Sequence, residues 1–277
     1  MAVFERAAVV GLGLIGGSVA RDLNACGTRV TGYDTDADHL ASALAEGVVH
    51  GVLDESLSGV CDAELVVVAV PVDAALDVLR RIAPFTAAAR LITDVGSTKV
   101  RIAGAARALG LGDRFVGSHP MAGDHRSGWG ASRTGMFAGA PVYVCPSDDA
   151  RPCLVDLTEA FWSELGARPV RMSSARHDET LAWTSHLPHM VAAALALALA
   201  QNGVARSDLG TGGRDATRLA GSSPDVWTAI AAENAGALDR ALAAVANEIA
   251  TIRGALEHVT HGELRDRLAA ARNWFQG

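Results

Sequence analysis

Hydrophobic and polar positions follow two different patterns along this chain, and the change comes near residue 172. Before it, short β-branched runs alternate with segments that carry apolar residues at helical spacing. The run at 65–70 is apolar throughout, as expected of a strand buried on both faces of a sheet. Other strands are predicted at 6–10, 29–33, 91–93, 115–117 and 142–144, and helices lie between them, for example at 18–25 and 71–82. The alternation predicts an α/β domain over residues 1–172 with a doubly wound, mostly parallel sheet.

After residue 172 the strand signals disappear, and Ala- and Leu-rich segments follow at 176–202, 224–257 and 261–275. They predict an all-helical second domain over residues 173–277. The segment 224–257 is apolar on more than one flank, so it needs several neighbours, a second subunit among the candidates. The most apolar run, 190–200, is too short to span a bilayer and is interpreted as a buried helix.

Composition and charge narrow the class of protein. A chain of 277 residues with 49% hydrophobic and 20% charged residues is typical of a globular protein with a sizeable core. A net charge of -7 argues against general binding to nucleic acid or acidic membranes. The N-terminus lacks the basic and apolar regions of a signal peptide, so we predict a cytoplasmic protein.

Two residue types are used sparingly. Four cysteines without a C-x-x-C pair predict buried or unreactive thiols, with neither a disulfide framework nor a zinc site. Among the 24 basic residues only Lys99 is a lysine. Since arginine is used almost everywhere else, the lysine at this position indicates that a compact ammonium group is needed there.

A glycine-rich turn predicts the nucleotide site. The pattern G-x-G-x-x-G at 11–16 directly follows a predicted strand and directly precedes a helix. Gly11 allows the tight turn, Gly13 lets the backbone approach a pyrophosphate, and Gly16 allows the strand and helix to pack closely. The helix N-terminus then offers N–H groups and a positive dipole end to the phosphates.

An acidic residue at the end of the next strand strengthens this interpretation and indicates the cofactor. Asp34 stands where a carboxylate would accept hydrogen bonds from the adenosine ribose hydroxyls. Asp36 and Asp38 follow it, and no Arg lies in this tip, so a 2′-phosphate would be repelled and we predict NAD rather than NADP. The complete predicted cofactor set is Gly11, Gly13, Leu14, Ile15, Gly16, Asp34, Val70, Pro71 and Gly96.

The candidate chemical residues lie at the ends of two later strands and in the helical domain. His119 is the best candidate for acid–base chemistry, and Ser97 could orient it or bind a substrate hydroxyl. His186 and His189 stand three residues apart on a helix that Pro188 is expected to break, but no third ligand accompanies them, so we predict no metal.

The glycine-flanked Arg218 could clamp a carboxylate, with Asp215 fixing its loop, although a surface ion pair is the alternative.

Together, these stretches resemble the prephenate/arogenate dehydrogenase family of tyrosine biosynthesis. The resemblance rests on GLGLIGGS at 11–18, VAVPV at 68–72, TDVGSTK at 93–99, GSHPMAG at 117–123, HDE at 177–179, SHLPH at 185–189 and GGRDATRLAGSSPDVW at 212–227. It implies a Rossmann-type domain that binds NAD and a helical domain that forms a homodimer.

The resemblance also implies roles for residues. His119 would be the catalytic histidine that hydrogen-bonds the ring hydroxyl of prephenate, with Ser97 assisting. His189 and Arg218 resemble the substrate-binding pair, and Trp227, Asp215 and Gly123 complete the predicted substrate site. NAD would take a hydride from C4 while His119 takes the hydroxyl proton, and loss of carbon dioxide would make the ring aromatic.

One departure leaves the substrate open. Many members of the family continue after HPMAG with Thr-Glu or Pro-Glu, whereas this chain has Asp124, a candidate for reading an amino group. Arogenate, which would give tyrosine, and an amino-substituted prephenate therefore remain alternatives to prephenate. A β-hydroxyacid dehydrogenase or imine reductase, and a non-catalytic NAD-binding regulator, are remoter alternatives. From the chain length we expect neither a regulatory nor a mutase domain.

Overall fold

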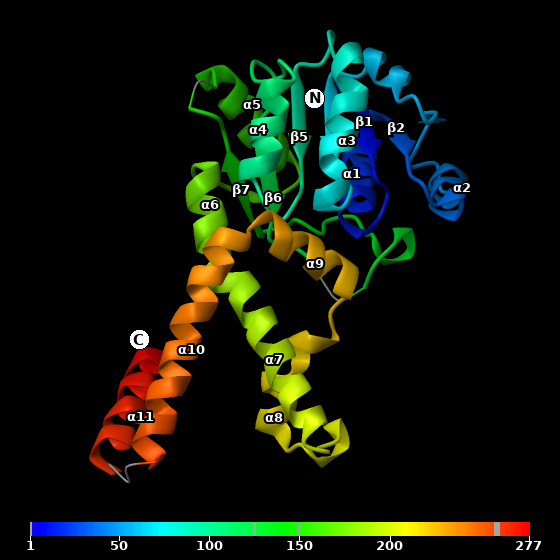
Figure 1. Ribbon diagram of the computed structural model, residues 1–277. Helices are drawn as coiled ribbons and strands as arrows, with labels where there is room; N and C mark the ends of the chain where they lie inside the picture. Colours follow the sequence, from blue (N-terminus) through cyan, green and yellow to red (C-terminus); the bar gives the residue numbers. More distant parts are fainter. Residues whose placement is uncertain (1, 124–125, 149, 258–260) are drawn as a thin grey trace. The chain divides into compact units, whose positions relative to one another are not determined.

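The structure, a computed structural model, describes residues 2–123, 126–148, 150–257 and 261–277 (Figure 1). Contacts between residues divide the chain into two compact units. Unit 1 comprises residues 1–180 and 222–234, and unit 2 comprises residues 181–221 and 235–277. The segment 222–234 thus returns to unit 1 after the first helices of unit 2. The domain boundary inferred from the sequence, at residue 172, stays a prediction.

A five-stranded parallel sheet forms the centre of unit 1. Its strands are β1 (Arg6–Val10), β2 (Arg29–Tyr33), β3 (Gly51–Val52), β4 (Leu65–Val68) and β5 (Leu91–Asp94). They lie in the order β3-β2-β1-β4-β5, and every neighbouring pair is parallel. This confirms the predicted doubly wound sheet. The short β3 was not predicted, because two residues carry no recognisable period.

Both faces of this sheet are covered, which explains the unbroken apolar run in β4. Val67 packs into a core with α1 (Leu14–Ala25), α2 (Ala37–Ala45) and α5 (Pro152–Glu164). Its neighbour Val68 packs into a second core with α3 (Val72–Ile82) and α4 (Val100–Ala108). Successive side chains of a strand point to opposite faces, so β1, β4 and β5 each contribute to both cores. The returning helix α9 (Pro224–Glu233) joins the second core through Ile230.

A second, three-stranded sheet continues unit 1. It consists of β6 (Gly117–Pro120), β7 (Pro141–Cys145) and β8 (Arg168–Arg171), with β6 antiparallel and β8 parallel to β7. The strand predicted at 115–117 begins later, at Gly117, while Phe115 forms an isolated bridge with Ile92 of β5. That bridge places the start of β6 beside β5. The sequence did not predict β8, because Arg occupies both its ends and most of the strand is exposed.

Unit 2 is helical, as predicted. Its α-helices are α7 (Leu187–Gln201), α8 (Thr211–Ala216), α10 (Ala235–Glu257) and α11 (His261–Gln276), the last lying alongside α10 (Figure 1). α6 (Ser174–Leu181) precedes a π-helical turn at Ala182–His186, and short 3-10 turns lie at Ser58–Asp62, Ala83–Phe85, Trp129–Ala131, Arg206–Asp208 and Arg218–Gly221.

The segment 224–257 is two helices rather than one. It is divided at Asn234, whose buried side-chain amide donates a hydrogen bond to the backbone oxygen of Asp178 (2.7 Å).

Two expectations about the apolar helix of unit 2 were wrong. Pro188 does not break the helix, because it lies in the first turn of α7, directly after the π-helical turn. The run 190–200 is not a buried helix either, since Leu195 and Leu197 are 38% and 62% exposed. Apolar residues of this run lie on all sides of α7, and the rest of unit 2 covers only one of those sides.

The continuous helix Ser174–Gln201 is long and apolar enough to cross a membrane by length and composition alone. Helices packed in protein interiors pass the same test.

Candidate active site

The three glycines of the β1–α1 turn differ in what surrounds them. Gly11 has φ +96°, and a Cβ atom there would overlap the backbone oxygen of Ala69 beyond β4. A Cβ on Gly16 would overlap the backbone oxygen of Gly11 and lie 2.8 Å from the Cβ of Ala69. Gly13, in contrast, has open space around it. Two glycines are therefore required by the fold itself, and the third leaves its backbone accessible.

The N-terminus of α1 offers hydrogen-bond donors beside this open glycine. Gly13 is the N-cap residue, and no side chain caps the helix. The N–H groups of the first turn, which contains Leu14 and Ile15, therefore lack a side-chain acceptor within the described residues and lie at the positive end of the helix dipole. These groups suit an anionic group such as a pyrophosphate.

Asp34 lies just beyond the end of β2, close to the same turn. Its carboxylate accepts hydrogen bonds from the backbone N–H groups of Leu12 (2.6 Å) and Asp36 (2.8 Å). A carboxylate has about four acceptor positions, so others remain for the two hydroxyls of a ribose. The residues present thus fit a dinucleotide, from the phosphates to the sugar.

Two charged or titratable side chains near the end of β2 were not predicted from the sequence. The Nδ1 atom of His39 lies 3.4 Å from a carboxylate oxygen of Asp34. The guanidinium of Arg81 stacks over the ring of Tyr33, 5.7 Å from its centroid, and donates a hydrogen bond to the backbone of Glu55. His39 lies on α2 and Arg81 on α3, and the sequence does not show that these helices bring the two side chains close to the end of β2.

The remaining predicted cofactor residues lie at the same carboxyl edge of the sheet. Val70 and Pro71 follow β4, and Gly96 and the half-buried Ser97 follow β5. Strand order reverses direction between β1 and β4, and open α/β sheets bind ligands at such a point.

A hydrogen-bonded chain of side chains connects β6 to α6. His119 lies on β6, and its Nδ1 atom is 2.9 Å from Nε2 of the fully buried His177. The Nδ1 atom of His177 is 2.7 Å from a carboxylate oxygen of Asp178. That carboxylate also accepts hydrogen bonds from the backbone N–H groups of Lys99 and Val100, each 2.8 Å long, at the start of α4. No role was predicted from the sequence for His177 or Asp178.

The environment of this chain shifts two of its pKa values. Burial, together with the nearby charge of Lys99, lowers the pKa of His177 despite its hydrogen bond to Asp178. Burial by itself would raise the pKa of Asp178, but the hydrogen bonds from His177 and the two backbone amides outweigh it, and the pKa is lowered. At neutral pH His177 is therefore neutral and Asp178 is ionised.

Lys99, the one lysine of the sequence, is completely buried beneath this chain. Its ammonium group forms an ion pair with Asp94 at the end of β5 and donates a hydrogen bond to the backbone oxygen of Ser118 (2.8 Å). The Ser118 hydroxyl in turn accepts a hydrogen bond from the indole N–H of Trp162 (2.9 Å). Lys99 thus connects the loop after β5 to the residue before His119 through a completely buried ammonium group.

In unit 2, the structure brings His189 and Arg218 together. His189 is half-buried on α7 and hydrogen-bonded to the backbone of Leu219. Burial, assisted by the positive charge of Arg218, lowers the pKa of His189. Arg218 is exposed and begins the 3-10 turn Arg218–Gly221. Asp215 is exposed on α8, and in the described chain no hydrogen bond or ion pair joins it to Arg218.

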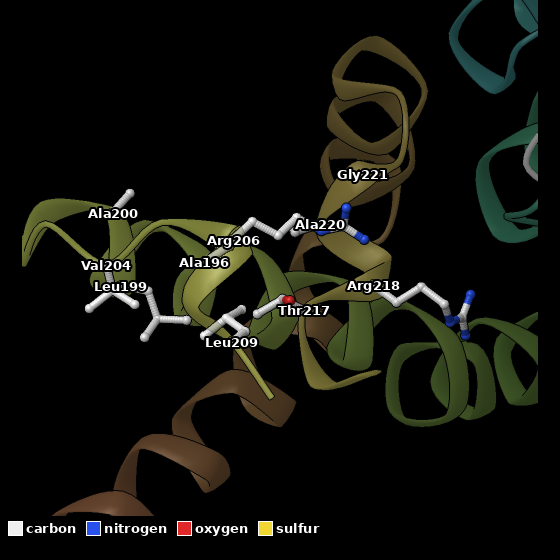
Figure 2. A pocket seen from close by; sticks show the side chains of 10 residues that line it. All are labelled: Ala196, Leu199, Ala200, Val204, Arg206, Leu209, Thr217, Arg218, Ala220 and Gly221. Atoms are coloured by element: carbon white, nitrogen blue, oxygen red, sulfur yellow. The ribbon is translucent and has the colours of Figure 1, made fainter. Parts of the chain in front are cut away.

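A cavity of about 510 Å³ lies beside Arg218 in the same unit. Its wall is mostly apolar, with Leu199, Ala200 and Val204 at one end (Figure 2). The side chain of Arg218 extends away from that end (Figure 2). The guanidinium is therefore available to a ligand outside the apolar cavity.

The other predicted substrate residues lie in unit 1. Trp227 is half-buried on α9 and packs against the core formed with α3. Gly123 is exposed in the loop after β6, and Asp124 lies outside the described residues. Unit 1 thus holds His119, Ser97, Trp227 and the nucleotide turn, whereas unit 2 holds His189, Arg218 and Asp215.

Neither metal nor cysteine chemistry adds to this picture. The described residues contain no group of three or more His, Cys, Asp or Glu that could hold a metal ion. Cys145 is buried, and burial raises the pKa of its thiol to about 12. Cys26, Cys61 and Cys153 are exposed.

Two domains of one family match the chain. Residues 19–171 match the nucleotide-binding domain of prephenate dehydrogenase, and residues 173–270 match its dimerization domain.

Three curated relatives share at least 31% of the aligned residues. Prephenate dehydrogenase of Bacillus subtilis is 37% identical over 235 residues, 82% of this chain but only 63% of that protein. Cyclohexadienyl dehydrogenase of Zymomonas mobilis is 35% identical, with 86% of this chain and 84% of that protein aligned. 4-Amino-4-deoxyprephenate dehydrogenase of Streptomyces pristinaespiralis is 31% identical, with 85% and 79% aligned. The aligned part of the chain thus spans less than two thirds of the B. subtilis protein.

Two solved structures are similar along almost the whole chain. Prephenate dehydrogenase of Aquifex aeolicus, in complex with hydroxyphenyl propionate and NAD+, has a TM-score of 0.90 at 27% identity and covers 98% of this chain and 97% of that one. Arogenate dehydrogenase of Synechocystis has a TM-score of 0.82 at 29% identity, with 98% and 99% covered. Since both domain matches and the aligned relatives extend over most of the sequence, this chain belongs to the prephenate dehydrogenase family.

Proposed function

We propose that this chain is an NAD-dependent prephenate dehydrogenase, which converts prephenate to 4-hydroxyphenylpyruvate by oxidation and loss of carbon dioxide. The observation that carries the proposal is His119, a nearly buried imidazole on β6 with one ring nitrogen hydrogen-bonded to His177. A positioned imidazole is suited to move a hydroxyl proton near neutral pH. Family membership supports this chemistry over that of a β-hydroxyacid dehydrogenase or an imine reductase.

NAD is the cofactor that fits the residues of unit 1. The pyrophosphate would lie against Gly13 and the uncapped N-terminus of α1, and Asp34 would accept hydrogen bonds from the adenosine ribose. The carboxylates of Asp34 and Asp36 disfavour a 2′-phosphate. NAD+ in the similar A. aeolicus structure supports the same choice.

In the proposed reaction, a hydride leaves the substrate ring and His119 transfers a proton. When bound, NAD supplies the acceptor for the hydride that leaves C4 of the substrate ring. His119 accepts the proton of the C4 hydroxyl as its carbon–oxygen bond gains double-bond character. The bond between the ring and its carboxylate then breaks, carbon dioxide leaves, and the electron pair makes the ring aromatic. His119 returns the proton to the oxygen, which becomes the phenol.

Arg218 and His189 would orient the substrate for this step. A guanidinium binds a carboxylate through two parallel hydrogen bonds, and prephenate carries two carboxylates. The guanidinium of Arg218 would attract a dianion locally, although the chain as a whole has a net charge of -7. Ser97 would bind or orient the hydroxyl, and Trp227, Gly123 and Asp215 stay predicted members of the substrate site.

We further infer that the enzyme is a homodimer formed through its helical unit. The dimerization domain of the family matches residues 173–270. Leu197 of α7 and Leu268 and Trp274 of α11 are large apolar side chains that are more than half exposed in the single chain. Burial of such side chains in an interface is favourable by roughly 25 cal/mol per Å². The cytoplasmic location stays a prediction.

Arogenate and 4-amino-4-deoxyprephenate are the alternative substrates, because relatives and similar structures carry all three names. All three share the ring that becomes aromatic. Arogenate has an amino group in place of the side-chain keto group of prephenate, whereas 4-amino-4-deoxyprephenate has an amino group in place of the C4 hydroxyl. Asp124, the residue expected to read an amino group, lies outside the described residues.

The proposal is tested by mixing the protein with NAD and each of the three substrates separately, and following the absorbance of reduced nicotinamide. We expect turnover of prephenate, its loss by at least a hundredfold in His119→Asn, and its retention in His50→Asn, an exposed histidine elsewhere in unit 1. Turnover of an amino substrate alone would replace prephenate with that substrate. Binding of NAD without turnover of any substrate would overturn the enzymatic proposal in favour of a regulator.

A further inference from the structure

The inference concerns two residues behind His119 that the proposed mechanism does not use. His177 and Asp178 are buried, adjacent in sequence, and aligned in one hydrogen-bonded chain with His119. We propose that they form a positioning dyad, which holds the proton of neutral His119 on Nδ1 and presents Nε2 as the proton acceptor. The catalytic part of this inference rests on the proposed function, whereas the position of the proton does not.

Asp178 determines which atoms donate and which accept in the hydrogen bonds that join it, through His177, to His119. An ionised carboxylate only accepts hydrogen bonds, so Nδ1 of His177 must be the donor in the 2.7 Å contact. The carboxylate is kept ionised by the backbone N–H groups of Lys99 and Val100 at the start of α4. Since these two donors belong to the backbone, the ionised state of Asp178 does not depend on a mobile side chain.

The charge state of His177 then decides which way the next hydrogen bond runs. The charged groups around it are Lys99, Asp94 and Asp178, and its ring also meets those of His119 and Tyr143. Burial and the Lys99 ammonium disfavour a second positive charge on His177. With its proton on Nδ1, neutral His177 has its lone pair on Nε2.

The tautomer of His119 follows from these two steps. Nε2 of His177 can only accept, so Nδ1 of His119 is the donor in the 2.9 Å contact. A neutral imidazole has one N–H group, and Nε2 of His119 therefore carries the lone pair. Protonation of His177 would reverse the contact, and the proton of His119 would then move to Nε2, where it would block acceptance of the substrate proton.

The ring of His119 is also held in orientation. Its plane is inclined by 64° to that of His177, with the ring centroids 5.1 Å apart. Tyr143 of β7 packs near both rings, at centroid distances of 6.5 Å from His119 and 5.6 Å from His177. When His119 takes up a proton, its Nδ1–H group keeps the same acceptor, and the negative charge of Asp178 lies at the far end of the chain.

Substitution of His177 tests the dyad without removing the cap that Asp178 provides to α4. In His177→Gln, the side-chain oxygen can still accept a hydrogen bond from His119. In His177→Leu, no acceptor remains in a side chain of similar size. We expect kcat for the proposed substrate to fall by about a hundredfold or more in His177→Leu and by less than tenfold in His177→Gln. The KM for NAD should stay within about twofold of the wild-type value in both variants, since His177 does not lie at the nucleotide turn.

A readout of the proton itself separates positioning from a merely structural role. In protein labelled with ¹⁵N-histidine, nitrogen–proton correlation spectra distinguish protonated from unprotonated ring nitrogens, and His119→Asn identifies the signals of His119. We expect wild type and His177→Gln to carry the proton of His119 on Nδ1 at neutral pH. His177→Leu should show a mixture of both tautomers, with its thermal unfolding midpoint recorded alongside.

Three results would overturn the inference. They are a proton on Nε2 of His119 in the wild type, an unchanged tautomer in a folded His177→Leu, and equal kcat losses in the Leu and Gln variants. If His177→Leu does not fold, the wild-type and Gln spectra still decide the matter. The proposed function fails separately, through absence of turnover in an enzyme whose His119 spectrum is nevertheless as expected.

Discussion

At the scale of the residue, we expect the carboxylate of Asp34 to decide which dinucleotide unit 1 accepts. It is held by two backbone N–H groups, from Leu12 and Asp36, so it does not rotate away from the turn. His39 and Arg81, which approach from α2 and α3, show that the nearby charge is less uniformly negative than the sequence indicates. The carboxylate remains the group that the ribose itself would meet.

Removal of the charge from Asp34 should therefore change cofactor preference. In Asp34→Asn, the ratio of kcat/KM for NAD over NADP should fall by about 10- to 100-fold, because hydrogen bonds to a charged group are worth roughly 1.5–3 kcal/mol. Asp38→Asn, on the exposed first turn of α2, is the matched control and should leave the ratio within about twofold. An unchanged ratio in Asp34→Asn would show that the ribose binds elsewhere.

At the scale of the element, the glycines of the turn between β1 and α1 serve two different purposes, helix packing and access of a ligand to the backbone. Gly16 permits α1 to approach β1 and β4, whereas Gly13 has open space and leaves its backbone exposed to a ligand. The pattern in the sequence does not distinguish these two purposes. Their different surroundings do.

Alanine at each position should separate folding from binding. Gly16→Ala places a methyl group against the backbone of Gly11 and the side chain of Ala69, and should destabilise the protein by about 1–3 kcal/mol, with a lower thermal midpoint. Gly13→Ala should leave that midpoint unchanged but raise the KM for NAD by at least about tenfold, because the methyl group meets the pyrophosphate. Normal NAD binding by Gly13→Ala would contradict the predicted place of the pyrophosphate.

Two properties belong to the whole molecule, its assembly and its response to pH. The first depends on the apolar side chains that unit 2 leaves exposed. Leu197→Asp and Leu268→Asp should each shift the enzyme from dimer to monomer in sedimentation velocity at micromolar concentration, because a charge in an apolar interface is costly. Leu44→Asp, equally apolar and 42% exposed but in unit 1, should stay dimeric. A wild type that sediments as a monomer would refute the inferred dimer.

The buried His177 makes folding stability depend on pH in a defined direction. Its pKa is lowered in the folded state, so the unfolded chain binds the proton more readily. The contribution is therefore complete above the ordinary histidine pKa of about 6.5 and is lost as the pH falls below it, by up to roughly 1.4 kcal/mol per unit of pKa shift. The thermal midpoint should drop more between pH 7.5 and pH 5.5 in wild type than in His177→Gln. Equal drops would show that His177 does not titrate differently on folding.

Much of this protein was determined by the sequence alone. The period of two in the strands and of 3.6 in the helices is local, so the α/β order, the helical second part and the nucleotide turn could be predicted from neighbouring residues. The boundaries of β6 and the division of 224–257 at Asn234 could not, since each depends on a partner far along the chain, Ile92 and Asp178.

The interior of the candidate site was decided only by the tertiary structure. His119 and His177 are 58 residues apart, and no spacing rule connects them. The second sheet, in the order β6-β7-β8, and α6, which follows β8, bring them into contact, and the start of α4 supplies the two amides that keep Asp178 charged. Lys99 likewise stood out in the composition, but only its burial against Asp94 and Ser118 gives it a physical role. Local periodicity determines which elements form, whereas the protonation and orientation of a catalytic side chain depend on groups that folding assembles from distant parts of the chain.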